Sequence, residues 1–213
     1  MAEKSHFEHP NTNRVDALTD GVFAIAATLL VIEIKLPNIP TPHTQQQVLN
    51  SLLEVVPSFV AFAISFFTIL IYWINHDGIS KAIKYYNHRG SWLNIILLFF
   101  IVIIPFPTKF IAEYPTELVS VVTYGITMML LGASANLLFW YLAFRANLLD
   151  PKISMKARRS IMKKFLFGPT LYLVATALAF VNVYISISIF IITPIIFFIP
   201  VSKENLLKEL RVE

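Results

Sequence analysis

Apolar residues gather into long runs along this 213-residue chain, and short polar stretches that carry most of the charge separate the runs. A membrane-spanning helix needs roughly 17 to 25 mostly apolar residues. The last two runs have almost no polar residue between them, so we expect a very tight turn at Asn182. The pattern predicts an all-α membrane protein with six transmembrane helices, at residues 17–36, 52–75, 92–110, 118–144, 161–181 and 183–201.

The composition of the chain supports this class. Apolar residues make up 56% of the sequence, the mean hydropathy is +0.67, and there are 18 phenylalanines. A soluble domain of this length is far less apolar, so we predict a multi-pass protein of the cell membrane, surrounded by the lipid bilayer. Cysteine is absent, which excludes disulfides and thiolate metal sites.

Lysine and arginine fall mainly before the first run, between the second and third, between the fourth and fifth, and after the last. An even number of spans with both termini in the cytosol places nearly all of this positive charge inside. We therefore predict one domain, residues 1–213, with a cytosolic segment 1–16, a transmembrane region 17–201 and a cytosolic tail 202–213. We interpret the basic stretch 145–164 as the cytosolic loop that sets this orientation, rather than as a nucleic-acid-binding segment.

The search for catalytic chemistry finds almost nothing. The five histidines have no metal-binding spacing, and the hydrolase, P-loop and dinucleotide motifs are missing. We predict that the protein is not an enzyme and needs no cofactor, resident metal or small-molecule substrate. The TVGYG filter of ordinary potassium channels is also missing, since residues 123–127 read TYGIT inside an unbroken apolar run.

A polar cluster of Arg14, Asp16, Thr19 and Asp20 leads directly into the first apolar run. Ionisable groups at the hydrocarbon edge cost on the order of 2 to 3 kcal/mol, so they usually face a bundle interior, a partner charge or a water path. Arg14 and Asp20 lie six residues apart, on different helical faces, so Asp20 needs a partner from another element. The simpler alternative is that Thr19 or Asp20 caps the helix.

The same cluster carries a family resemblance. Arg14, three residues, and then Leu18-Thr19-Asp20 resembles the R-x-x-x-F-S-D signature of the endosomal and lysosomal potassium channel family called transmembrane protein 175. Leu18 replaces the phenylalanine and loses an aromatic contact, whereas Thr19 replaces the serine and keeps the hydroxyl. The segment from Trp73 to His76 looks like the W-x-x-H element of the family.

Bacterial members of this family carry one six-helix repeat per chain, which is the size found here. The resemblance implies a homotetrameric, potassium-preferring channel in which the first helix of each subunit lines a central pore, with potassium ion as the permeant. By analogy, Ile25 forms the narrowest hydrophobic ring, Leu29 and Ile32 form further rings toward the outside, and Thr28 forms a hydroxyl layer. Hydrophobic constrictions gate by dewetting.

The resemblance also implies a structural polar network at the cytosolic end of the first helix, which supports the pore helix without contacting ions. Its members are Arg14, Thr19, Asp20, Trp73 and His76. The pKa of a histidine lies near the physiological range, so His76 is also a candidate pH sensor, although a single histidine near a helix end is more often structural.

Helical geometry gives an independent check on the first helix. Leu18, Ile25, Leu29, Ile32 and Leu36 fall on one stripe at helical spacing. Such a stripe is also what an ordinary lipid or helix contact requires. Two alternative functions therefore stay open. The first is a secondary transporter, for which Asn136 is the best mid-membrane polar residue although no internal repeat is found. The second is a membrane scaffold without transport.

Overall fold

The computed structural model describes residues 12–35, 37–39 and 41–198, and every long element in them is a helix. This confirms the all-helical fold. The elements are α1 (Thr12–Leu29), the 3₁₀ turn η1 (Leu30–Glu33), α2 (Gln45–Glu54), α3 (Val56–Ser80), α4 (His88–Ile103), α5 (Pro105–Glu113), α6 (Leu118–Trp140), the π-helical turn η2 (Tyr141–Arg145), α7 (Met155–Leu178) and α8 (Val183–Phe198).

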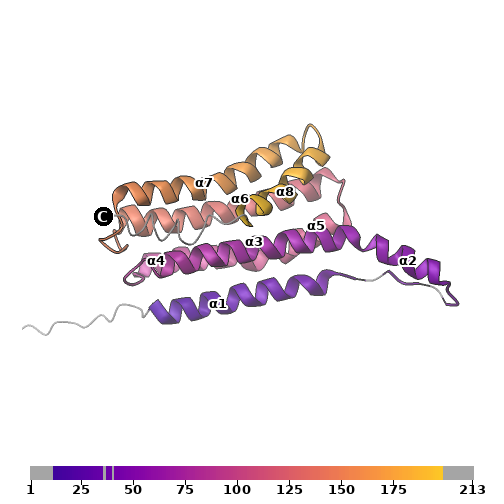
Figure 1. The fold of residues 1–213 in the computed structure, drawn as a ribbon, viewed down its shortest axis with the longest axis horizontal. Coiled ribbons are helices and arrows are strands. Elements are labelled where there is room, and N and C mark those ends of the chain that lie inside the picture. Colours follow the sequence, from indigo (N-terminus) through magenta and orange to yellow (C-terminus); the bar gives the residue numbers. More distant parts are fainter. Residues whose placement is uncertain (1–11, 36, 40, 199–213) are drawn as a thin grey trace, which may run out of the picture.

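The long helices run side by side, and α1 lies along one edge of the bundle (Figure 1). It packs on α3 and α4, while α6 packs on α4 and α7 farther from that edge. The short helix α2 extends past the end of the bundle. The edge position leaves one face of α1 without a neighbour from the described part of its own subunit.

Five helical stretches are long and apolar enough to cross a membrane, which confirms a multi-span protein. They are Asn13–Glu33, Gln45–Ser80, His88–Glu113, Leu118–Arg145 and Met155–Leu178. The sixth predicted span corresponds to α8, which is a shorter apolar helix. The end of that span at residues 199–201, the predicted tail 202–213 and residues 1–11 of the N-terminal segment lie outside the described residues.

Prolines explain where two predicted spans differ from the helices. The second predicted span crosses the boundary between α2 and α3, where Val55 caps both helices and Pro57 lies in the first turn of α3. The third span is divided at Ile104, because Pro105 begins α5. Proline fits the first turn of a helix, where its missing N–H has no intrahelical partner to lose.

The basic stretch 145–164 combines turns with helix, since residues 155–164 form the first turns of α7, which begins six residues before the predicted fifth span. Ser154 starts α7 by accepting a hydrogen bond from the Ala157 backbone N–H at 3.2 Å. Arg158 is buried and donates to the Ala143 carbonyl at 2.7 Å, which fastens α7 to the preceding turn. The predicted tight turn is confirmed, since the Asn182 Oδ1 accepts from the Tyr184 N–H at 2.9 Å between α7 and α8.

Candidate functional site

One face of α1 is packed against the bundle. Thr19, Phe23, Ala26 and Leu30 are each at most 2% exposed. Their spacing of four, three and four residues puts them on a single helical face, and this face meets α3 and α4. Packing therefore fixes which side of α1 is turned away from the bundle.

The other face of α1 carries the predicted pore positions. Ile25 is 60% exposed and Ile32 is 66% exposed, and Leu29 and Thr28 are exposed beside them. The Thr28 hydroxyl donates back to the carbonyls of Ala24 and Ile25, at 3.0 Å each. The structure thus places all four predicted positions on the outward side of α1 and its 3₁₀ extension. Leu36, the last member of the predicted stripe, lies outside the described residues.

A buried asparagine of α4 joins α1 to α3 near the N-terminal end of α1. The Asn94 Nδ2 donates to the Thr19 hydroxyl at 2.8 Å, and the Asn94 Oδ1 lies 2.8 Å from the His76 Nε2. Thr19, His76 and Asn94 are at most 4% exposed. One amide therefore bridges two neighbouring helices inside the bundle.

The proton positions in this bridge follow from the partners. The Thr19 hydroxyl donates to the Val15 carbonyl at 2.8 Å, so its oxygen accepts from the Asn94 NH₂ group. That turns the Asn94 Oδ1 toward His76, and the His76 Nε2 therefore carries the hydrogen. The geometry assigns the Nε2–H tautomer to His76.

Two further hydrogen bonds connect α1 with α3 around this bridge. The Trp73 Nε1–H donates to the Asp20 Oδ1 at 2.8 Å, at an exposed position. The Ser80 hydroxyl donates to the Asp16 Oδ1 at 2.5 Å. Asp20 therefore has a partner from another helix, as its position in the sequence requires.

Tyr86 lies beside His76 in the interior of the subunit. Its hydroxyl lies 3.3 Å from the His76 Nε2, and its side chain is fully buried. Burial raises the pKa of Tyr86 far above its ordinary value, and the nearby Asp16 carboxylate raises it further. Tyr86 consequently stays neutral at physiological pH and acts as a hydrogen-bonding group.

Sequence reasoning named some members of this cluster and missed others. The structure brings together Thr19, Asp20, Trp73 and His76, but not Arg14. The Arg14 side chain is exposed and has no hydrogen bond or ion pair with any residue in the described ranges. The sequence missed Ser80, Tyr86 and Asn94, and it placed Asp16 in the polar cluster without assigning it to the network. Asn94 had a visible signal, since an amide within an apolar run needs a partner.

The replacement of the signature phenylalanine has little effect on packing inside the subunit. Leu18, which stands at that position, is 56% exposed and points away from the core. An aromatic contact with His76 comes from Phe23, whose ring centroid lies 6.2 Å from the imidazole. The polar network is therefore packed by a residue five positions further along α1.

The C-terminal end of α1 is attached differently. The Glu33 Oε2 of η1 lies 3.0 Å from the Lys109 Nζ of α5, and both side chains are partly exposed. Salt bridges at such positions contribute little to stability, because solvent screens the two charges. This ion pair therefore holds the C-terminal end of α1 only weakly.

Asn136, the candidate residue of the transporter alternative, donates a hydrogen bond to a backbone carbonyl of α7 that Pro169 leaves without its helical donor. Its Nδ2 donates to the Gly132 carbonyl at 2.9 Å and to the Phe165 carbonyl at 3.1 Å. Pro169 lies four residues after Phe165 within α7 and has no N–H to offer that carbonyl. Asn136 supplies the missing donor, as polar side chains do where a proline interrupts a membrane helix.

Known proteins resemble this chain over nearly its full length. A family model described as endosomal/lysosomal potassium channel TMEM175 matches residues 14–105. The chain is 38% identical over 193 residues to a potassium channel of Chamaesiphon minutus, covering 89% of this chain and 95% of the relative. It is 32% identical to a potassium channel of Streptomyces collinus, covering 80% of this chain and 84% of the relative.

A solved structure agrees with these relatives. The crystal structure of a lysosomal potassium-selective channel TMEM175 homologue from Chamaesiphon minutus matches the fold with a TM-score of 0.77 and 35% identity. The match covers 88% of this chain and 96% of that one. The similarity therefore includes the helices that hold α1 in place, beyond the segment that carries the sequence signature.

Proposed function

This chain belongs to the TMEM175 family of endosomal/lysosomal potassium channels, and on that premise we propose that it is a potassium-permeable cation channel of the cell membrane. Four identical subunits surround the pore, and α1 of each subunit lines it. Membership in a channel family confirms the prediction that the chain is not an enzyme. Potassium is the permeant ion rather than a bound cofactor.

The observation that carries the proposal is the division of α1 into two faces. One face packs against α3 and α4 through the buried residues Thr19, Phe23 and Leu30. The opposite face carries Ile25 and Ile32, which project away from the subunit. An exposed apolar face alone also suits lipid. However, the buried bridge through Asn94 fixes the rotation of α1 about its axis, which a constriction built from single side chains requires.

The exposed side chains support a gate without a re-entrant filter. Copies of Ile25, Leu29 and Ile32 around a symmetry axis form successive hydrophobic rings, which block ions by dewetting when narrow and pass partly hydrated ions when wide. Thr28 lies between these rings. Its hydroxyl hydrogen is directed to backbone carbonyls, so the oxygen is available as an acceptor for a hydrated cation.

The secondary-transporter alternative is less well supported. A transporter needs a polar substrate site near mid-membrane depth. Both amide hydrogens of Asn136, its best candidate residue, are engaged with helix carbonyls. The channel proposal requires no such site.

A flux assay with Ile25→Asn tests the channel. Purified protein in liposomes with a potassium gradient is compared with the variant, and the assay is repeated with sodium. We expect flux above that of empty liposomes, a several-fold increase in Ile25→Asn because the constriction becomes wet, and weaker potassium preference. The matched control is Ile126→Asn, at an exposed isoleucine of α6. Unchanged flux in a folded Ile25→Asn protein, or an equal change in the control, would remove Ile25 from the pore.

Subunit number is tested separately. Native mass spectrometry of the detergent-solubilised protein should give a mass of four chains. A monomer that still conducts would overturn the shared pore, because one copy of α1 cannot enclose an ion path.

A further inference from the structure

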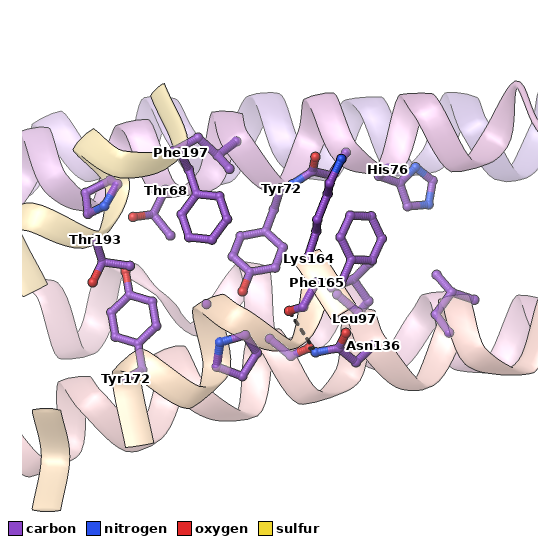
Figure 2. A pocket seen from close by; sticks show the side chains of 18 of the residues that line it. Thr68, Tyr72, His76, Leu97, Asn136, Lys164, Phe165, Tyr172, Thr193 and Phe197 are labelled. Carbon is purple, nitrogen blue, oxygen red and sulfur yellow. Dashed lines mark hydrogen bonds between the residues drawn. The ribbon is translucent and has the colours of Figure 1, made fainter. Parts of the chain in front are cut away.

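An exposed stripe of side chains runs along α7, at the edge of the bundle opposite α1 (Figure 1). Its first part is basic. Lys156, Arg159 and Lys163 are all exposed, and their spacing of three and four residues places them on one helical face. The adjacent Lys164 belongs instead to the lining of an internal cavity (Figure 2). We call the three exposed cations the basic face of α7.

The same stripe becomes apolar after Lys163. Leu166, Phe167, Leu173 and Val174 are each between 45% and 53% exposed. Their positions continue the helical spacing of the basic face, while the other side of α7 packs on α6 and α8. One exposed surface therefore carries a charged part and an apolar part in line along a single helix.

Two hydrogen bonds between α6 and α7 locate the change from charged to apolar side chains. The Asn136 Nδ2 donates to the Phe165 carbonyl at 3.1 Å, and these two residues lie side by side in Figure 2. The Arg158 Nη1 donates to the Ala143 carbonyl at 2.7 Å. Trp140 lies between Asn136 and Ala143 in the chain, so it is level with the segment between Arg158 and Phe165. Since Trp140 is 45% exposed, and exposed tryptophans gather at the membrane–water interface, the change lies at the level of the lipid headgroups.

The basic face is electrostatically unfavourable by itself. Lys156, Arg159 and Lys163 have no side-chain hydrogen bond or ion pair with any residue in the described ranges, and the first turn of α7 contains no acidic residue. Like charges one helical turn apart repel, and cations at the start of a helix meet the positive end of its dipole. An anion among these side chains would relieve both effects. Membrane orientation requires positive charge at this end of the bundle, but it does not require three cations on one exposed face.

We propose that this stripe of α7 binds one anionic phospholipid of the surrounding bilayer. The lipid phosphate lies among Lys156, Arg159 and Lys163, where the arginine can donate two parallel N–H bonds and the lysines add charge. One acyl chain follows the apolar part of the stripe from Phe167 toward Val174. This apolar part favours a lipid over a soluble phosphate or a nucleic acid, neither of which has a hydrocarbon chain. Such a site depends on the membrane-spanning fold and not on ion conduction.

Native mass spectrometry of the full chain in a neutral detergent measures this binding. The protein is titrated with phosphatidylglycerol or with phosphatidylcholine of the same acyl chains. We expect one phosphatidylglycerol per subunit to be retained at concentrations at which phosphatidylcholine is not. The half-saturating concentration of phosphatidylglycerol should rise roughly tenfold or more when Lys156→Gln, Arg159→Gln and Lys163→Gln are combined, because each cation near an anionic headgroup contributes about fivefold in affinity.

A matched control removes the same charge from the same end of the bundle, outside the stripe. It combines Arg14→Gln, Lys84→Gln and Arg89→Gln, which replace exposed cations of α1, of the turn after α3 and of α4. The half-saturating concentration should stay close to that of the wild type. A further arm adds an excess of glycerol 3-phosphate, a headgroup without acyl chains, which should not displace the lipid. All six substitutions are at exposed positions, and thermal denaturation checks that both variants are folded.

Four results would overturn the proposal. The first is equal retention of the two lipids by the wild-type protein, and the second is an unchanged half-saturating concentration in the α7 variant. An equal loss of affinity in the control would show that net charge attracts the lipid without any role for this face. Displacement by glycerol 3-phosphate would show a site for soluble anions, to which the apolar part of the stripe contributes nothing.

Discussion

At its N-terminal end α1 is joined to α3 and α4 by buried hydrogen bonds between neutral groups, whereas its C-terminal end is joined to α5 by a partly exposed ion pair. The buried bonds require fixed positions of Thr19, His76 and Asn94, because a displaced polar group inside the bundle loses its partner. The Glu33–Lys109 pair tolerates displacement, since solvent screens it. We therefore expect the C-terminal half of α1 to move more readily than the N-terminal half.

Asn94→Leu should break this contrast most strongly. The substitution removes the bridge between α1 and α3 and leaves the His76 Nε2–H without its closest acceptor. We expect the free energy of unfolding to fall by about 1 to 3 kcal/mol. Thermal denaturation of the purified protein in detergent measures this, with Asn38→Leu, at an exposed asparagine, as the control. Equal stability of the two variants would show that the bridge does not hold α1.

Thr19→Val should have the next largest effect. Valine has the shape of threonine but lacks the hydroxyl, so the Asn94 NH₂ group loses its acceptor. We expect a loss of about 1 to 2 kcal/mol, and little loss in Thr19→Ser, which keeps the hydroxyl. The same denaturation assay decides this. A serine variant as unstable as the valine variant would mean that the methyl group matters rather than the hydrogen bond.

Trp73→Phe should be milder, because its bond to Asp20 lies at an exposed position. We expect the free energy of unfolding to fall by about 0.5 to 1.5 kcal/mol.

Asp20→Asn keeps an acceptor oxygen and should assemble better than Asp20→Ala, as followed by size-exclusion chromatography. If Asp20→Ala assembles and conducts normally, this bond has no part in supporting α1.

Lys109→Met should have the smallest effect on stability, because the ion pair with Glu33 is partly exposed and solvent screens it. The effect should shrink further at high salt. The charge reversal Glu33→Lys with Lys109→Glu should restore wild-type behaviour. A loss as large as that of Asn94→Leu would contradict the proposed difference between the two ends of α1.

The sequence predicted the helices better than their ends. Apolar runs of membrane length are a strong signal, and the turn at Asn182 also followed from the pattern. The division at Ile104 was missed because apolar residues continue across it, so only Pro105 marked the break. The start of α7 was missed because its first turns are basic, and charge alone does not separate a solvent-exposed helix from a loop.

The polar network shows what the sequence alone could not provide. The bond between Asn94 and Thr19 joins residues 75 positions apart, so no local pattern indicates it. The motif resemblance pointed to Thr19, Asp20, Trp73 and His76, and the structure brings these residues together. It gave no reason to choose Tyr86, whose contact with His76 appears only in the packed structure. Asn94 carried only the general signal of an amide within an apolar run, which does not identify its partners.

If the exposed face of α1 lines an aqueous pore, a water-soluble reagent reaches its side chains, and cysteine accessibility measures this. The chain has no cysteine of its own, so a single introduced thiol is unambiguous. Ile32→Cys and, as the control, Ile126→Cys on α6 are placed in liposomes and treated with a positively charged, membrane-impermeant thiol reagent. We expect that modification blocks potassium flux in Ile32→Cys and leaves flux through Ile126→Cys unchanged. An Ile32→Cys protein that conducts but does not react, or that reacts without any change in flux, would contradict it.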